Sequence, residues 1–444
     1  MKGNIYELES NIKKVLKKES HAEIYFSNKE THCFEINDKQ EKNYSLFSDM
    51  GIAARVFDGK RIGFSSRPGF SEDDINSALE DARENIKFTN NNFYIPFVRK
   101  KSQCHFIPKF SSSDINPLDY LDEDLFKVID EKAYKTGLSL KNIYFYSKIE
   151  QFLLINTVQV QGGGTANLYS LGFNFHLKNE KLDECFIITT ISPKVAKIDV
   201  DEVISQAKKV ANTKIIASLR KKIIDCPILL THNAVSIIIY VFLSLLTSES
   251  IFHKRSFISN KNANISFGNQ LTIVENSKIN KIYNANIDRE GISRREVKII
   301  EKGELCNIIS DTKYGTKMKI ASTSSAWRDS YQQMPKVKAT SISVEAGIFS
   351  TEEIINRYNQ IFIIDDLMGI ASGINPNTSD FQVTSEGYLI NNKGLLGRAR
   401  VFFQSNLINL FNSIIEISKD REYGIDGSVY VPSFLIDSIK LTVI

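Results

Sequence analysis

The pattern of hydrophobic and polar residues divides the first hundred residues into a helix, several short strands and a second helix. In residues 1–20 the apolar positions recur at helical spacing, and the segment is too charged for a signal peptide. Asp58-Gly59 suits a tight hairpin turn, and Ser71 precedes three acidic residues as a helix N-cap would. We predict an N-terminal α/β section with strands at 22–26, 32–36, 52–56 and 61–64.

A linker is expected between residues 90 and 113, where periodicity gives way to Asn, Pro, Ser and isolated aromatic residues. The next section begins with a predicted helix at 118–136 and ends with one at 199–222, whose acidic start and basic end complement the helix dipole. Between them, the run Gly162 to Gly164 is predicted to be a flexible turn, since no phosphate-loop lysine follows it. Strands are predicted at 143–146, 152–156 and 173–177.

The apolar segment 227–246 approaches the length of a membrane span, about 20 residues, but His232 and Asn233 interrupt it. We predict instead a helix buried in a large domain, and no membrane association. Hairpin patterns follow, and residues 406–418 carry an apolar stripe at helical spacing. The two predicted hairpins pair 297–300 with 304–309, and 388–390 with 395–403.

These elements predict an α+β protein, with mixed α/β N-terminal and middle sections and a β-rich C-terminal domain. The length of 444 residues is enough for two or three cores. The expected boundaries are an N-terminal α/β domain at 1–100, a central α/β domain at 112–222 and the β-rich domain at 225–444.

Composition narrows the class of protein. The net charge is only +4, and Lys and Arg are interleaved with Asp and Glu, so no nucleic-acid partner is expected. The cysteines are odd in number and form no CxxC pair, which argues against a disulfide framework and for a reducing cytoplasm. They are Cys33, Cys104, Cys185, Cys226 and Cys306.

No catalytic motif stands out. A zinc peptidase helix needs two closely spaced histidines that face one ion and a glutamate that activates water, and the six histidines lack such a pair. His232 is the nearest candidate, but Asn233 and Ser236 stand where Glu and a second His could be, so we predict only a local hydrogen bond. A G-x-S-x-G nucleophile elbow is also absent. We therefore expect this chain to bind no cofactor.

Two polar loops could line a cleft. The first contains Asp288, Glu290 and Gly291 and precedes a hairpin. The second is a run of turn-forming residues whose candidate positions are Ser372, Gly373, Asn375, Thr378 and Asp380. For both loops the alternative is purely structural, because Gly and Asn adopt left-handed turns while Asp and Thr cap backbone groups.

These stretches, in this order, resemble the TldD/PmbA family. The N-terminal run from Ser48 to Val56, with Asp58-Gly59, looks like that family's opening hairpin. The run from Asp288 to Gly291, followed by 300–305, is similar to its D-x-E-G … I-E-x-G-x-L signature. The loop from Ser372 to Phe381 looks like its S-G-x-N-P-x-T-G-D-F block, although Ser379 replaces the usual Gly. The segment 394–400 also departs from the family pattern.

The resemblance implies a subunit of a cytoplasmic metallopeptidase. In this family a catalytic subunit carries HExxxH on a helix at the start of the last section, and a related partner lacks it. The two form a heterodimer that cleaves unfolded or leader peptides. In this chain the corresponding helix starts near His232 without the metal-binding pattern, and the segment 252–257 looks like the partner type. The expectation is a partner subunit, with zinc held by a homologous HExxxH-bearing chain.

Two alternatives stay open. One is a stand-alone peptide-binding protein, or a factor that modulates gyrase or a toxin–antitoxin pair, as the family's older naming suggests. The other is an independent hydrolase that uses Asp288, Asp380 or Cys306, motivated only by polar loops.

Overall fold

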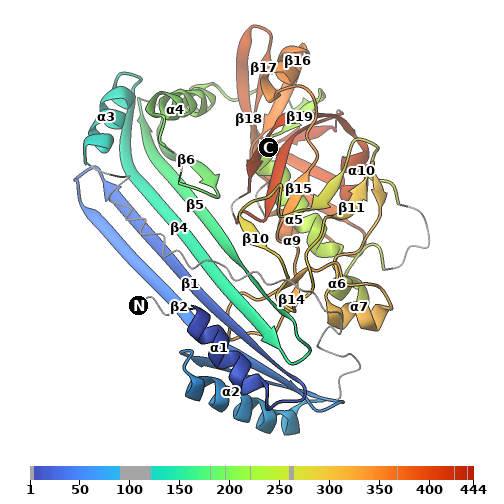
Figure 1. Ribbon diagram of the computed structural model, residues 1–444. Helices are drawn as coiled ribbons and strands as arrows, with labels where there is room; N and C mark the ends of the chain where they lie inside the picture. The colour runs from blue at the N-terminus through green and yellow to red at the C-terminus, as the bar shows by residue number, and fades with distance from the viewer. Residues whose placement is uncertain are drawn as a thin grey trace.

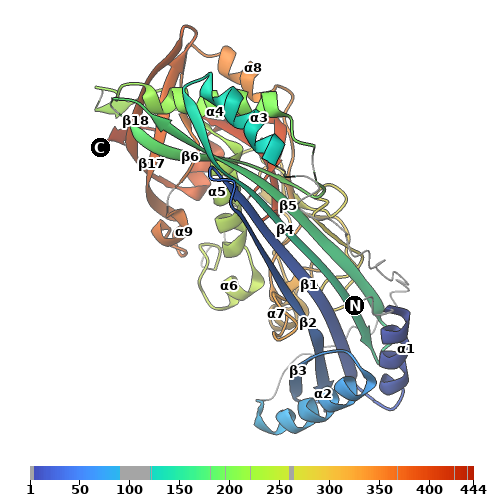
Figure 2. The same ribbon diagram turned by 90° about the vertical axis from the view of Figure 1, so that its left-hand side faces the viewer.

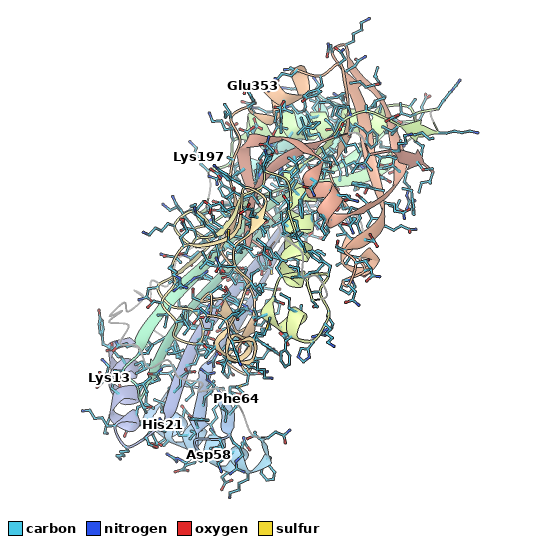
Figure 3. All side chains as sticks on the ribbon, turned by 90° about the vertical axis from the view of Figure 1, so that its right-hand side faces the viewer. Lys13, His21, Asp58, Phe64, Lys197 and Glu353 are labelled. Carbon is cyan, nitrogen blue, oxygen red and sulfur yellow. The ribbon has the colours of Figure 1, made fainter. Side chains whose placement is uncertain are left out.

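In the computed structural model the described residues are 5–90, 121, 123–180, 182–195, 197–220, 222–259, 265–367, 369–424, 426–437 and 439–444. Over these ranges the protein is elongated, and Figure 1 shows a long twisted sheet beside a more compact β-rich body. Figure 3 places Asp58, in the β2–β3 turn, and Glu353, in α8, at opposite ends of the molecule. The predicted linker lies almost wholly outside the described residues.

The described strands of the N-terminal half form one antiparallel sheet. Its order is β10-β5-β4-β1-β2-β3, with β6 beside β5. β1 and β4 pair from Glu23–Asn156 to Asn37–Asn142, so the sheet continues through both predicted sections, 1–100 and 112–222. Those two ranges therefore do not form separate sheets, and their exact boundaries stay predictions. The strands are β1 (Ala22–Asn37), β2 (Lys42–Phe57), β3 (Ile62–Pro68), β4 (Leu138–Asn156), β5 (Gln161–Lys178), β6 (Asp183–Ser192) and β10 (Tyr283–Ala285).

The two faces of this sheet have different partners, because successive side chains of a strand point to opposite sides. Ile24 and Phe26 belong to a core with α1 and α2, while α3 and α4 cover the other end of the sheet (Figure 2). Tyr25 faces the opposite way and packs with Ile287 and Tyr331 of the C-terminal half. The helices are α1 (Ile5–Leu16), α2 (Glu72–Asn85), the 3-10 turn η1 (Ile86–Phe88), α3 (Glu123–Tyr134) and α4 (Val200–Ile215).

The C-terminal half is built on a second, mixed sheet whose described strands run β12-β11-β9-β15-β20-β8-β16-β17-β18-β21-β7, with β19 beside β20. This arrangement confirms the predicted α+β class with a β-rich C-terminal part. The strands are β7 (Ile223–Ile224), β8 (Ile228–Leu230), β9 (Ile273–Glu275), β11 (Val297–Glu301), β12 (Glu304–Leu305), β15 (Ile342–Val344), β16 (Gln360–Ile364), β17 (Asp380–Asn391), β18 (Gly394–Asn406), β19 (Ile414–Tyr423), β20 (Val429–Ile436) and β21 (Leu441–Val443).

Helix α5 (His232–Leu245) is the centre of the C-terminal core. Phe242 has no exposed surface and contacts the rings of Phe257, Phe267 and Phe411. The predicted buried helix is confirmed, and none of the helices in the described ranges has the length and apolar character of a membrane span. The remaining elements are α6 (Ser248–Phe252), α7 (Thr312–Met318), α8 (Thr351–Asn356), α9 (Ile370–Gly373), α10 (Leu407–Asn412), and the two-stranded ribbon of β13 (Ala326–Trp327) and β14 (Lys336–Val337).

Two predictions from short sequence patterns, the hairpin turn at Asp58-Gly59 and the helix N-cap at Ser71, are confirmed. Gly59 has a φ of +98° in the β2–β3 turn. Ser71 caps α2 by accepting the Asp74 backbone N–H, and the Asp74 carboxylate accepts the Ser71 N–H in return.

Several predicted boundaries are wrong, including that of the strand at 304–309, which ends at Leu305. The strands at 22–26 and 32–36 are one strand, as are 143–146 and 152–156, because β1 pairs with strands on both sides and extends through its polar middle. The helix at 199–222 ends at Ile215, and Ser218 bridges to β18 instead. The helix at 406–418 ends at Asn412, because Ile414 pairs with Ile436 in the sheet.

The glycine run is also not a flexible turn. Gly162 and Gly164 lie buried in β5, where β10 and the chain after it cross close to the strand. A Cβ on Gly164 would lie 2.3 Å from the Cβ of Ala285, and one on Gly162 would lie 2.7 Å from Ile287. These glycines let a segment of the C-terminal half join the N-terminal sheet.

The substitution Gly164→Ala therefore should lower the free energy of unfolding by about 1–3 kcal/mol, the usual cost of overpacking. Gly172→Ala is the matched control, because it lies in the same strand and its Cβ would find only ordinary contacts at 3.5 Å and beyond. Urea titration of both variants measures the difference. Equal stabilities would show that β10 does not depend on the glycines.

Candidate functional site

The predicted loop from Asp288 to Gly291 is a buried turn. Asp288 accepts the backbone N–H groups of Glu290 and Ile292 at 2.9 Å, and that of Ala326 at 3.2 Å. Gly291 has a φ of +87°, which favours glycine. Asp288 thus organises the backbone around it, and the structural alternative for this carboxylate has direct support.

The next residue, Arg289, connects this turn to the N-terminal sheet. Its Nη2 donates to Glu150 Oε1 of β4 at 2.7 Å. The guanidinium lies 3.5 Å from the ring centroid of Phe152 and 4.6 Å from that of Trp327, so it is held between two aromatic faces.

A second connection centres on Glu23 of β1. Its carboxylate accepts two hydrogen bonds from Arg55 of β2, at 2.8 and 2.7 Å, and one from Arg328 at 2.7 Å. Arg55 Nη1 lies 3.9 Å from Glu290 Oε1, which brings the motif carboxylate into the same network. The side chains of these two glutamates and two arginines are all buried. We call Glu23, Arg55, Glu150, Asp288, Arg289, Glu290, Asp311 and Arg328 the interdomain ion cluster.

Two carboxyls of this cluster have raised pKa values. Burial, and then the neighbouring Glu290 carboxylate, raise the pKa of Asp288 to about 7 and that of Asp311 to about 7. Asp311 Oδ1 accepts the Tyr314 N–H at the start of α7, while its Oδ2 is buried with no hydrogen-bond partner among the described residues. Burial of each carboxyl is the larger cause of its shift, and the neighbouring acid adds to it.

The second predicted loop lies in a different environment. Ser372 and Gly373 end α9, and the Asn375 carbonyl and amide close a turn with Ser379 and Asp380. The Asp380 carboxylate accepts a hydrogen bond from Asn406 at 2.8 Å, and the Asp380 N–H donates to Thr378 Oγ1. These residues join α9 to β17, whereas the first predicted loop precedes β11.

Sequence reasoning missed Glu23, Glu150 and Arg328 as members of a site, and it included Arg289 in the first polar loop without giving it a role. One signal was present: Arg55 lies within the apolar run Ile52–Val56, which is buried on both faces of the strand. A charged residue in such a position needs a buried partner.

Two family models match the two parts of this chain that the ion cluster joins. The one described as PmbA/TldA metallopeptidase C-terminal domain matches residues 224–443, and the one described as PmbA/TldA metallopeptidase domain 1 matches residues 22–86. The chain belongs to the TldD/PmbA family.

Relatives of similar length agree with this membership. An uncharacterized protein of Methanocaldococcus jannaschii is 23% identical over 424 residues, which are 94% of this chain and 96% of that protein. A zinc metalloprotease TldD homolog of Saccharolobus solfataricus is 22% identical over 388 residues, which are 84% of this chain and 83% of that protein.

Solved structures share the fold. TldE from Thermococcus kodakarensis has a TM-score of 0.84 at 17% identity, covering 98% of this chain and 99% of its own. A suggested modulator of a DNA gyrase from Thermotoga maritima has a TM-score of 0.79 at 14% identity. The match covers 99% of this chain and 100% of that chain.

In this TldD/PmbA chain, α5 follows β8 at the position where the family resemblance expects the metal-binding helix. His232 opens α5, and its Nε2 lies 3.5 Å from Glu422 Oε2 of β19 rather than making a local hydrogen bond. The Asn233 amide lies 3.3 Å from the Asp365 carboxylate, and Ser236 donates to the Asn233 carbonyl. Within the described ranges no three His, Cys, Asp or Glu side chains are grouped to hold a metal ion.

Removing Arg328 tests the cluster as a tie between the two halves. Arg328→Met leaves Glu23 buried with one cation instead of two. We expect the free energy of unfolding to fall by about 3 kcal/mol. Arg67→Met, which breaks an exposed pair with Asp81, should cost less than about 1 kcal/mol. Trp327, the single tryptophan, reports unfolding of this region by fluorescence in urea. Similar losses in both variants would contradict the role of Arg328.

The raised pKa of Asp311 predicts a pH dependence of opposite sign to that of a paired carboxylate. An unfolded aspartate titrates near about 3.9, so from about pH 4 to about pH 7 the folded chain holds a proton that the unfolded chain has lost. Stability then falls across this window by up to about 1.4 kcal/mol per pH unit.

Asp311→Asn keeps a capping side chain and removes the ionisation. Its free energy of unfolding should therefore fall less than that of the parent chain between pH 5 and 7, and should exceed it at pH 7.5. Asp366→Asn, in an exposed segment, is the control and should follow the parent curve. Parallel curves for all three chains would exclude a raised pKa at Asp311.

Proposed function

We propose that this chain is the non-metal-binding subunit of a TldD/TldE-type metallopeptidase. In this proposal it pairs in the cytoplasm with a homologous subunit that carries HExxxH and zinc. The substrate is an unfolded or leader peptide, and this chain shapes the channel that holds it.

The observation that carries the proposal is the chemistry of α5. The helix contributes one histidine, His232, and no carboxylate. Its later positions are mostly Ile, Val, Phe and Leu side chains packed in the core, and Tyr240 and Ser244 are exposed. A water-activating zinc site needs several nitrogen or carboxylate ligands and a general base on facing positions. The residues of α5 suit packing, so in this proposal the peptidase chemistry belongs to the partner.

Family membership and fold support the same proposal. The shape is shared over nearly the whole chain with a protein named TldE, and the sequence is related to one named as a zinc metalloprotease TldD homolog. A family that contains a metalloprotease and a distinct TldE is consistent with a two-subunit enzyme, since one fold can host different functions.

The stand-alone alternative makes a different prediction. A peptide-binding or gyrase-modulating protein would act without a partner, whereas a peptidase subunit needs one. The decisive comparison is therefore between the lone chain and its mixture with a HExxxH-bearing homologue.

We expect zinc and cleavage of an unfolded peptide only in the mixture, measured by elemental mass spectrometry and by chromatography of the products. His232→Ala in this chain should leave cleavage unchanged, whereas replacing a histidine of HExxxH in the partner should abolish it. Zinc bound by the lone chain, together with cleavage that His232→Ala removes, would overturn the proposal. A complex that never forms would favour the stand-alone alternative.

A further inference from the structure

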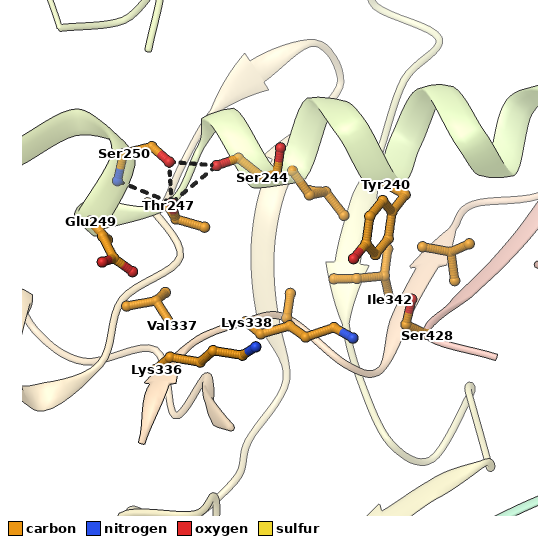
Figure 4. Close-up of a pocket in the computed structure, with 13 residues that line it drawn as sticks. Tyr240, Ser244, Thr247, Glu249, Ser250, Lys336, Val337, Lys338, Ile342 and Ser428 are labelled. Atoms are coloured by element: carbon orange, nitrogen blue, oxygen red, sulfur yellow. Dashed lines mark hydrogen bonds between the residues drawn. The ribbon is translucent and has the colours of Figure 1, made fainter. Parts of the chain in front are cut away.

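A cavity of about 280 Å³ opens beside the C-terminal end of α5, apart from both predicted loops. One wall is formed by α5, α6 and the turn between them, and the other by β14, the chain after it, and the start of β20 (Figure 4). Its volume is close to the lower end of small-molecule sites, about 300 Å³. It suits a ligand no larger than a few amino-acid residues.

The base of the cavity is apolar and its α-helical wall is fixed. Leu243, Val337, Ile342 and Val429 line it. The hydroxyls of Thr247 and Ser250 donate to the Ser244 carbonyl at 3.0 and 2.9 Å. These bonds, drawn in Figure 4, join the end of α5 to the start of α6. The hydroxyls therefore hold the wall in place, and charged groups are left to recognise a ligand.

Two lysines line the cavity. Lys336 lies in β14 and Lys338 directly follows that strand. Lys336 pairs with Asp329, and Lys338 Nζ lies 3.5 Å from Asp426. Lys338 Nζ also lies 5.8 Å from the ring centroid of Tyr240 and 6.0 Å from that of Trp327. An ammonium has three donor hydrogens, so a single aspartate leaves capacity for a ligand carboxylate.

A negative charge, the carboxylate of Glu249, lies on the wall formed by α6. Figure 4 shows Glu249 toward one end, while the ammonium of Lys338 lies toward the other, near Tyr240 and Ser428. The Tyr314 hydroxyl donates to Glu249 Oε1 at 3.0 Å, which fixes the carboxylate and leaves its second oxygen as an acceptor. The cavity thus has a cationic end, an apolar base and an anionic end.

We propose that this cavity binds the C-terminal end of a short peptide. The terminal carboxylate lies at Lys336 and Lys338, the last side chain covers Val337 and Ile342, and an amine or backbone N–H group reaches Glu249. The ligand class rests on the proposed function, which makes peptides the substrates. The new element is recognition of a free chain end by this subunit.

The test uses the lone chain and calorimetric titration with trialanine, its C-terminal amide and its N-acetylated form. We expect the amide to bind at least about tenfold more weakly than the free acid, because it loses the charge that the lysines recognise. N-acetylation should weaken binding less in Glu249→Gln than in the parent chain, since that variant has already lost the partner of the amine.

Lys338→Gln and Lys336→Gln should each reduce the preference for acid over amide, and Lys393→Gln, in the exposed β17–β18 turn, should leave it unchanged. Lys336 is half-exposed, so its variant remains informative if Lys338→Gln does not fold. Equal affinity of the parent chain for acid and amide, or no binding of trialanine at millimolar concentration, overturns the proposal. Because no partner subunit is present, this result is independent of whether the mixture cleaves peptides.

Discussion

Glu23 is a carboxylate with no exposed surface that holds two guanidinium groups from opposite halves of the chain. Burying such charges is expensive, and their attraction repays the cost only while every partner is in place. Arg289 and Glu150 add a second buried pair between the C-terminal half and the same sheet. The long N-terminal sheet and the C-terminal half can therefore separate only by exposing or orphaning several charges at once. The position of α5 and the cavity beside it, relative to the sheet, follows from this constraint.

The sequence predicts the elements whose causes are local. The cap at Ser71, the turn at Gly59 and the apolar density of α5 each act within a few residues, and each is confirmed. The full length of β1 could not be predicted, because its polar middle is stabilised by backbone pairing to β2 and β4 rather than by its own pattern. The same limit explains why residues 414–418 look helical in sequence and form a strand.

In the candidate site, too, the residues within a local motif could be predicted and their distant partners could not. Motif resemblance selected Asp288 and Glu290, and the structure places both in the interdomain ion cluster. It could not select Glu23, Glu150 or Arg328, because isolated charges in a sequence usually indicate exposed faces. The partners across the two halves lie 139 positions apart for Glu150 and Arg289, and 305 for Glu23 and Arg328. Whether any of the selected positions contacts a peptide stays a prediction. The turn at Asn375 to Asp380 is accounted for by hydrogen bonds within the loop and to Asn406.

The distance in sequence between Glu23 and Arg328 has a consequence for how this protein is made. The two partners are separated by 305 positions, and β1 also pairs with β4 from beyond residue 137. A growing chain on the ribosome thus exposes Glu23, Tyr25 and the glycine-lined part of β5 until most of the protein has been synthesised. Completion of the N-terminal sheet is in this sense a late event, and a chain that stops before Arg328 keeps an open, charged and partly apolar face that chaperones would recognise.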